Sequence, residues 1–152
     1  MNEFEKLCAI VARLRGADGC PWDREQTNAS LVPPLLEEAY EIAGAVYAQD
    51  DGNLREELGD LLLLVAMHAQ IASEGNRFSI EDVAREITEK LIRRHPHVFG
   101  ESTARGSEAV IKQWEAIKQE EKKGNYFASL PAALPALMRA EKAQKKAARV
   151  NF

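Results

Sequence analysis

The sequence of 152 residues has only two cysteines, Cys8 and Cys20, and no long hydrophobic run. Two cysteines are too few for a disulfide scaffold, so we expect reduced thiols and a cytoplasmic location. The longest apolar run, Leu61 to Met67, is far shorter than the roughly 20 residues that a membrane span needs. The N-terminus has acids in its first turn and no continuous apolar segment, which excludes a signal peptide.

Glycine and proline are also too scarce for a fibrous or disordered chain. With 45% hydrophobic and 29% charged residues, the composition is typical of one compact globular domain. The net charge of −4 gives no reason to expect nucleic acid or an anionic membrane as a partner. Basic residues are nevertheless concentrated near the C-terminus, in residues 139–149.

No segment favours a strand, and hydrophobic residues recur at the three- and four-residue intervals of a helix. Helices are expected at 3–15, from an N-cap at Ser30 to about Gln49, from Leu54 to about Ser73, from a capping box of Ser79 and Asp82 to about His95, from Ser107 onward and from about Ala136 onward. Residues 16–30 are expected to form a loop and 50–53 a tight turn. The short connections predict an all-α, antiparallel four-helix bundle whose central helix, 54–73, is buried on nearly all sides.

Two consecutive predicted helices carry the same acidic pattern. The first supplies Glu37, Glu38 and Glu41, and the second supplies Glu56, Glu57 and Asp60. A three-residue step turns about 60° around a helix, so Glu38 shares a face with Glu41, and Glu57 shares one with Asp60. Both faces border hydrophobic positions, where isolated carboxylates are costly and repel one another unless a cation lies between them.

Carboxylate oxygens are the ligands of Mg²⁺, with Mn²⁺ as the alternative, and there is no cysteine or histidine pair to suit zinc. Glu37 and Glu56 point further from the apolar stripe and are expected in the outer shell or in solvent. The alternative is a solvated acidic surface without metal. The register stays open, because Glu41 and Asp60 are nearly level when counted from the turn.

Cations and aromatic residues occur further along the chain. Lys90 and Arg94 share one helix face, as do Trp114 and Lys118, and such pairs suit a phosphate and a base. The alternative is a buried Trp114 and a solvated Lys118. His68 is expected as a satisfied core or outer-shell histidine, and Trp22 as either a loop anchor or a base-stacking residue.

These segments together resemble the MazG-type nucleoside triphosphate pyrophosphohydrolases of the all-α NTP pyrophosphatase superfamily. The resemblance rests on "GCPWDREQT", "LLEEAYEIAGAV", "LREELGDLLLLVAMHAQIA", "KLIRRHPHVFG", "QWEAIK" and "LPALMRAEKAQKKAARV". Members often have Asp where Gly44 stands and His where Asn28 stands.

The resemblance implies Mg²⁺-dependent hydrolysis of nucleoside triphosphates to monophosphates and pyrophosphate by a homodimer or larger oligomer, which completes the bundle. It implies metal ligands at Glu38, Glu41, Glu57 and Asp60, with Glu38 or Glu41 helping to deprotonate the attacking water. It implies nucleotide contacts at Lys90, Arg94, Trp114 and Lys118.

Residues 1–124 are expected to form the MazG-like helical domain, and 125–152 a connector and a basic C-terminal helix. The chain ends where a second domain often begins in this family, so it is either a one-domain homologue or the N-terminal half of a longer protein. Two alternative functions stay open. One is a narrower dUTP, dCTP or phosphoribosyl-ATP pyrophosphohydrolase, and the other is a non-hydrolytic helical module that binds a nucleotide or a partner protein.

Overall fold

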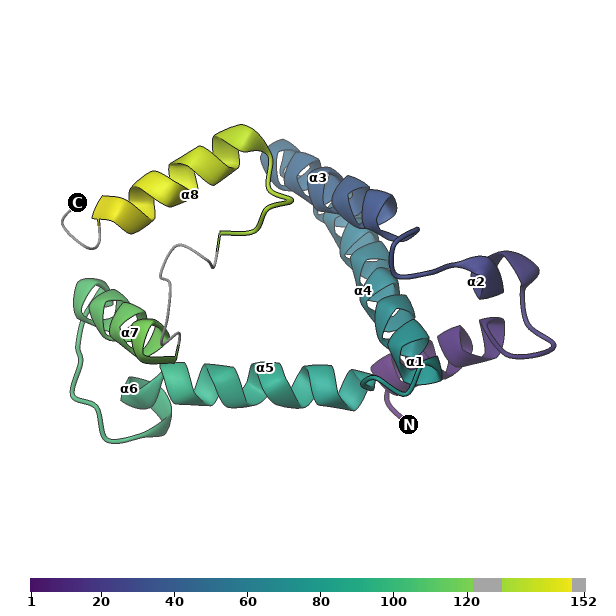
Figure 1. Ribbon diagram of the computed structural model, residues 1–152, viewed down its shortest axis with the longest axis horizontal. Helices are drawn as coiled ribbons and strands as arrows, with labels where there is room; N and C mark the ends of the chain where they lie inside the picture. The colour runs from purple at the N-terminus through teal and green to yellow at the C-terminus, as the bar shows by residue number, and fades with distance from the viewer. Residues whose placement is uncertain (122–129, 149–152) are drawn as a thin grey trace. The chain divides into compact units, whose positions relative to one another are not determined.

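The computed structural model describes residues 1–121 and 130–148, and all regular structure in these ranges is helical. The helices are α1 (Glu3–Leu14), α2 (Pro21–Glu25), α3 (Val32–Ala48), α4 (Asp51–Glu74), α5 (Ile80–Arg94), α6 (Pro96–Phe99), α7 (Ser107–Glu121) and α8 (Ala136–Ala148) (Figure 1). The all-α prediction is therefore confirmed.

Internal contacts divide the chain into two compact units, which we call the N-terminal unit (Met1–Ile87) and the C-terminal unit (Thr88–Phe152). The division falls within α5. The predicted domain boundary at 124 lies outside the described residues, as does part of the connector 125–135, so that domain organisation stays a prediction. None of the described helices is both long and apolar enough to span a membrane.

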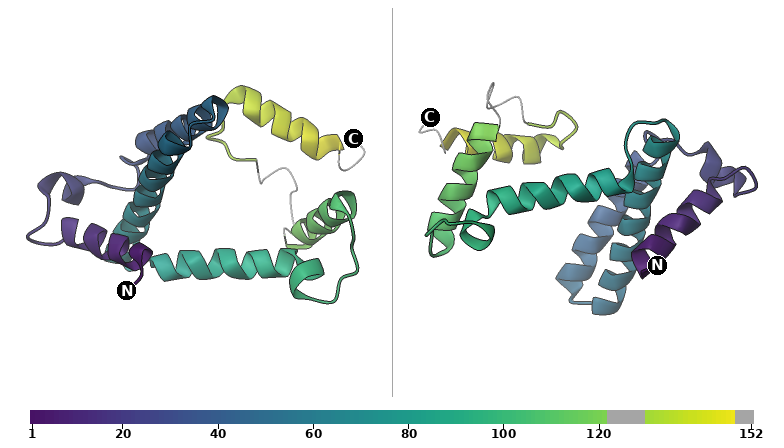
Figure 2. Two further views of the ribbon diagram at one scale, coloured as in Figure 1. Left: turned by 180° about the vertical axis from the view of Figure 1, so that it is seen from behind. Right: turned by 90° about the horizontal axis from the view of Figure 1, so that it is seen from below.

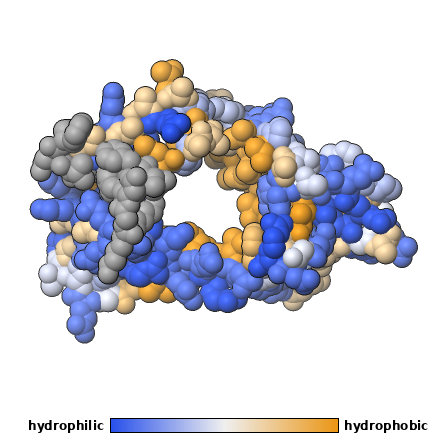
Figure 3. All heavy atoms as spheres, in the orientation of Figure 1, coloured by the Kyte–Doolittle hydropathy of each residue, from blue (hydrophilic) through white to orange (hydrophobic). Residues whose placement is uncertain are grey.

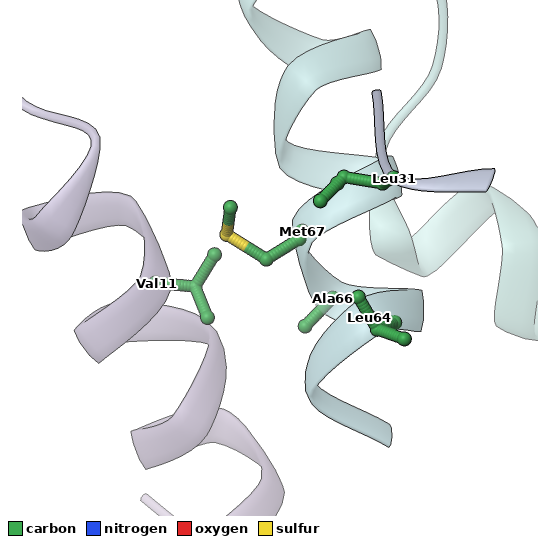
Figure 4. Close-up of a cluster of buried hydrophobic side chains, with 5 residues drawn as sticks. All are labelled: Val11, Leu31, Leu64, Ala66 and Met67. Carbon is green, nitrogen blue, oxygen red and sulfur yellow. The ribbon is translucent and has the colours of Figure 1, made fainter. Parts of the chain in front are cut away.

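The N-terminal unit is organised around α4, which packs against α3 on one side and α1 on another (Figure 2). Its buried centre joins Val11 of α1 to Met67 and Leu64 of α4, with Leu31 entering just before α3 (Figure 4). Burial of these side chains provides the main free energy that holds the three helices together, because removing apolar surface from water is the dominant favourable contribution to folding.

Helix boundaries in this unit follow local hydrogen bonding. Asn2 begins α1 with a capping box in which its side chain accepts a hydrogen bond from the backbone N–H of Glu5. Gln49 ends α3 in the left-handed conformation with φ 56°, and Asp50 then caps α4 by accepting from the backbone N–H of Asn53 at 3.0 Å. The chain thus reverses within two residues, which makes α3 and α4 antiparallel neighbours.

Several predicted boundaries were wrong. Ser30 does not cap α3, since Leu31 holds that position without a side-chain hydrogen bond. The Ser30 hydroxyl instead donates to the side chain of Gln26 at 2.8 Å, inside the loop. The loop also contains the short helix α2, and the predicted turn 50–53 is mostly the first turn of α4, because Asp50 supplies a cap there.

The predicted capping box at the start of α5 is confirmed: Asp82 accepts from the backbone N–H of Ser79 at 2.8 Å, and Ser79 accepts from that of Asp82 at 3.2 Å.

The prediction that the central helix is buried on nearly all sides was also wrong. In α4 the residues Leu58, Leu62 and Val65 are exposed, and the buried positions are confined to 64–72. No residue of α5 is buried. The described chain has too few helices packed on α4 to cover its whole circumference, so one hydrophobic side of the helix stays open.

We expect Met67→Ala to lower the free energy of unfolding by about 2–5 kcal/mol, the usual cost of such a cavity in a core. Met67 is 3% exposed, whereas Met138 of α8 is 53% exposed. Met138→Ala makes the same change at the surface and is expected to cost under about 0.5 kcal/mol. Urea unfolding followed by circular dichroism measures both. Equal losses of unfolding free energy in the two variants would contradict the assignment of Met67 to the core.

Candidate active site

The structure brings three of the predicted metal ligands together. Glu38 and Glu41 of α3 and Glu57 of α4 each offer a carboxylate oxygen, and these oxygens all lie within 4.8 Å of one another. Asp60 is outside this group of three, although its charge acts on both Glu38 and Glu57. We call Glu38, Glu41, Glu57 and Asp60 the acidic cluster.

The packing of α3 against α4 settles the register that the sequence left open. Glu38 and Glu41 are one helical step apart, so both face α4, and the antiparallel arrangement brings Glu57 opposite them. Glu38 and Glu57 are half-buried while Glu41 is exposed. The cluster therefore opens to solvent at Glu41 and reaches the helix–helix contact at the other two residues.

Burial and like charge together raise the pKa of two of these acids. Desolvation by burial, followed by the negative charges of Glu41 and Asp60, raises the pKa of Glu38. Desolvation again comes first in raising the pKa of Glu57, followed by the charge of Glu41. Both shifts mean that an uncompensated negative charge is unfavourable here.

The residues present fit a divalent cation. The Oε2 atom of Glu38 is buried and has no hydrogen-bond partner within the described residues, and a buried unpaired carboxylate oxygen is costly. The group offers only carboxylate oxygens, which are hard ligands suited to Mg²⁺ or Mn²⁺. Glu37 and Glu56 are exposed and lie outside the group of three, as the sequence predicted for outer residues.

A second cluster occupies the C-terminal unit. The Lys118 ammonium lies 4.0 Å from the centroid of the Trp114 ring, and the Arg94 guanidinium lies 5.8 Å from the same centroid. Both are cation–π contacts. We call Arg94, Trp114 and Lys118 the cation–aromatic cluster. Lys90 is half-buried, and none of the described hydrogen bonds or ion pairs joins it to these residues.

His68 lies outside the acidic cluster and belongs to a polar contact that fixes the loop before α3. The side-chain amide of Asn28 donates to Nδ1 of His68 at 2.9 Å and to its carbonyl at 3.1 Å. Arg77 donates to the Asn28 oxygen at 2.6 Å. Because Nδ1 accepts, the ring proton is assigned to Nε2, which has no hydrogen-bond partner in the described part of the chain.

Sequence reasoning missed the arginine that holds the loop bearing Trp22. Arg15 donates to both carboxylate oxygens of Glu74, at 2.9 and 2.7 Å, and to the carbonyl of Gln26 at 3.1 Å. Its partners are distant in the sequence, so no local pattern could reveal the contact. Trp22 itself lies exposed on α2, which does not support a role as a buried anchor.

Glu121 is the other residue that the sequence did not single out. Its carboxylate pairs with Arg93 at 2.6 Å and with Arg94 at 2.5 Å. The side-chain hydrogen bonds from Arg94 and then Arg93 lower the pKa of Glu121 to about 2. Glu121 therefore stays ionised at neutral pH, beside the cation–aromatic cluster.

The described chain is all-α, and it gathers three carboxylates between two antiparallel helices in a way that is compatible with a divalent cation. A family model described as the MazG nucleotide pyrophosphohydrolase domain matches residues 26–99, and these residues include the whole acidic cluster. The crystal structure of a MazG-related protein from Thermotoga maritima aligns with a TM-score of 0.64 and 32% identity, over 76% of this chain and 98% of that one. The chain belongs to the MazG family.

Curated relatives agree. A nucleoside triphosphate pyrophosphohydrolase of Escherichia coli K12 is 48% identical over all of this chain and 60% of its own length. A nucleoside triphosphate pyrophosphohydrolase/pyrophosphatase MazG of Thermotoga maritima is 48% identical over 98% of this chain and 58% of its own length. The chain thus spans about three fifths of the length of these relatives.

We expect Mg²⁺ to raise the melting temperature of the wild-type protein, because a ligand that binds only the folded state stabilises it. Glu38→Gln is expected to abolish this rise while leaving the metal-free melting temperature unchanged or higher, since the substitution removes charge repulsion. Glu56→Gln, the same change at an exposed residue outside the acidic cluster, is the control and is expected to keep the rise. Thermal melts with EDTA and with Mg²⁺ measure both effects.

An Mg²⁺-dependent rise that persists in Glu38→Gln would contradict the assignment of Glu38 as a ligand. Loss of the rise in Glu56→Gln as well would show that the effect comes from general acidity rather than from the acidic cluster.

Proposed function

We propose that the protein hydrolyses nucleoside triphosphates to nucleoside monophosphates and pyrophosphate. The observation that carries the proposal is the convergence of Glu38, Glu41 and Glu57 within 4.8 Å in a chain of the MazG family. Relatives that carry the name nucleoside triphosphate pyrophosphohydrolase support it. The substrate and the metal dependence are part of the proposal.

The acidic cluster is proposed to hold Mg²⁺, with Mn²⁺ as the alternative, through Glu38, Glu41, Glu57 and Asp60. When bound, the metal polarises the phosphate oxygens and lowers the pKa of a coordinated water. The protein's own contribution is to fix the carboxylates on two packed helices. This preorganisation means that little rearrangement is needed when charge develops in the transition state.

In the proposed reaction, a water oxygen attacks the α-phosphorus, and the bond between this phosphorus and the oxygen that bridges to the β-phosphorus breaks. The bridging oxygen leaves as part of pyrophosphate. Glu38 or Glu41 is proposed to accept the proton of the water. In the metal-free protein, desolvation and then the charges of Glu41 and Asp60 raise the pKa of Glu38, so a positively charged partner at this carboxylate is favourable.

The cationic residues are proposed to serve the phosphates and the base. Lys90, Arg94 and Lys118 of the C-terminal unit are proposed to contact phosphate groups, as guanidinium and ammonium groups do. Trp114 offers an aromatic face for a base, and in this structure Lys118 lies over its ring. Trp22, exposed on α2, is proposed as a base-stacking residue.

We expect Glu57→Gln to lower the rate of triphosphate hydrolysis by about 10²-fold or more, the usual scale for losing one preorganised electrostatic group. Glu56→Gln makes the same change at its exposed neighbour outside the acidic cluster, and it is expected to lower the rate far less because Glu56 acts on Glu57 only through its charge. Phosphate release measured with added pyrophosphatase, across all ribo- and deoxyribonucleoside triphosphates, reports the rates.

Full activity of Glu57→Gln would contradict the acidic cluster as the active site. Absence of hydrolysis for every triphosphate in the wild type, with Mg²⁺ and with Mn²⁺, would favour a non-hydrolytic binding module. Activity confined to one pyrimidine triphosphate would identify a narrower enzyme.

We further propose that the protein is a homodimer. The side of α3 turned away from the core carries Leu36, Tyr40 and Tyr47, and the two tyrosines are 66% and 85% exposed. Hydrophobic residues also reach the surface over α3 and α4 (Figure 3). Contiguous exposed apolar patches mark interaction sites in folded proteins.

A second copy of the α3–α4 pair would cover this side of α3 and complete the four-helix bundle that the sequence predicts.

We expect Tyr40→Asp to convert the protein to a monomer, because a charge at the centre of an apolar interface is left without a partner. Sedimentation equilibrium over a range of concentrations measures the mass. Ile111→Asp, on an exposed position of α7, is the control and is expected to keep the dimer. A wild-type protein that stays monomeric at high concentration would contradict the proposal.

A further inference from the structure

Glu121 joins two arginines through separate oxygens. Its Oε1 accepts from Nε of Arg93 at 2.6 Å, and its Oε2 accepts from Nε of Arg94 at 3.0 Å and also from Nη2 of Arg94. All of these residues belong to the C-terminal unit. One carboxylate therefore bridges two adjacent guanidinium groups in the way that two oxygens of a phosphate can.

The Arg94 and Glu121 side chains of this bridge are partly shielded from water. The side chains of Arg94 and Glu121 are 15% and 19% exposed, whereas that of Arg93 is 53% exposed. Charge pairs that are partly removed from water interact more strongly than pairs at the open surface. Because its pKa is lowered to about 2, Glu121 carries its full negative charge under all conditions in which the protein is expected to work.

The same arginine also faces the aromatic ring of the cation–aromatic cluster. Arg94 approaches Trp114 while two of its three nitrogens are engaged by Glu121. Arg94 therefore shares its hydrogen-bond donors between the carboxylate of Glu121 and any phosphate ligand. A phosphate that takes full bidentate contact with Arg94 has to displace Glu121 or tolerate its charge.

We propose that Glu121 is an internal competitor of the phosphate ligand, which lowers the affinity of Arg94 for a polyphosphate and speeds release of the product. This inference rests on the proposed function in one respect, namely that Arg94 binds phosphate groups. It adds a residue that sets affinity without contacting the reacting atoms.

The consequence is an exchange of ion pairs on binding. In the free protein Glu121 neutralises the arginines and fixes their orientation. When a polyphosphate binds, its oxygens replace the carboxylate, so the gain in free energy is only the difference between two charge-assisted contacts. Removing the charge of Glu121 removes the competitor, and the bound pyrophosphate then leaves more slowly.

The test is binding of inorganic pyrophosphate to the full chain, measured by isothermal titration calorimetry in the presence of Mg²⁺. Glu121→Gln is expected to bind pyrophosphate about three- to fivefold more tightly than the wild type, the upper end of what an ion pair in contact with solvent contributes. The KM for the triphosphate is expected to fall by a similar factor without a rise in kcat, because release of the product becomes slower.

Glu120→Gln provides the matched control. It makes the same change of charge at the neighbouring exposed position of α7, where none of the described ion pairs includes Glu120. Its affinity for pyrophosphate is expected to stay within about twofold of the wild type, since exposed charges are screened. Equal gains in both variants would overturn the inference, because the effect would then be a general change of net charge.

A second variant guards against loss of folding. Glu121→Asp keeps the charge but is too short to bridge both arginines in the observed way, so its affinity is expected to fall between the wild type and Glu121→Gln. Circular dichroism and thermal melts confirm that each variant is folded. Weaker binding in both Glu121 variants would overturn the proposal and show that Glu121 orients the arginines for the ligand.

The outcomes also separate this inference from the proposed function. If the wild type hydrolyses no triphosphate but Glu121→Gln binds pyrophosphate more tightly, the role of Glu121 as a competitor is supported and the proposed hydrolysis is contradicted. If the protein hydrolyses triphosphates but Glu121→Gln does not change the affinity for pyrophosphate, the proposed hydrolysis is supported and the role of Glu121 as a competitor is overturned.

Discussion

The packing of α3 against α4 forces carboxylates of like charge into one small volume, and much of the N-terminal unit can be understood from that constraint. Glu38 and Glu57 are held at the helix contact by the apolar core that surrounds Met67. The core provides the free energy that keeps the acids together against their repulsion. A divalent cation would turn this repulsion into coordination, so stability and the proposed function meet at the same residues.

In the C-terminal unit, positive rather than negative charges lie close together. Arg93 and Arg94 are neighbours in sequence and repel each other, and Glu121 compensates by pairing with both. The two units thus treat charge differently. None of the ion pairs among the described residues gives the acidic cluster a cationic partner, and Oε2 of Glu38 has no hydrogen-bond partner there, whereas the arginines are paired with Glu121. Under the proposed function, the unpaired acidic cluster favours a tightly bound metal ion, and the paired arginines favour a ligand that binds and dissociates in each catalytic cycle.

The sequence was most informative where the relevant forces are local. Helical periodicity, the capping box at Ser79 and the start of α7 at Ser107 depend on residues within one or two turns. The cap predicted at Ser30 failed because a hydroxyl can bond to several nearby groups, and Gln26 was available. The predicted burial of α4 failed because the number of helices packed on it is a property of the whole chain and its partners.

The sequence by itself determined that the protein is helical, that its acids share faces of two consecutive helices, and that its motifs are those of the MazG family. These follow from spacing, since a helix fixes the direction of each side chain. Only the tertiary structure decided that Glu57 meets Glu38 and Glu41 more closely than Asp60 does, and that Glu121 rather than solvent pairs with Arg94. Such contacts depend on how one helix is placed along another, and the side chains that set this placement lie far apart in the chain.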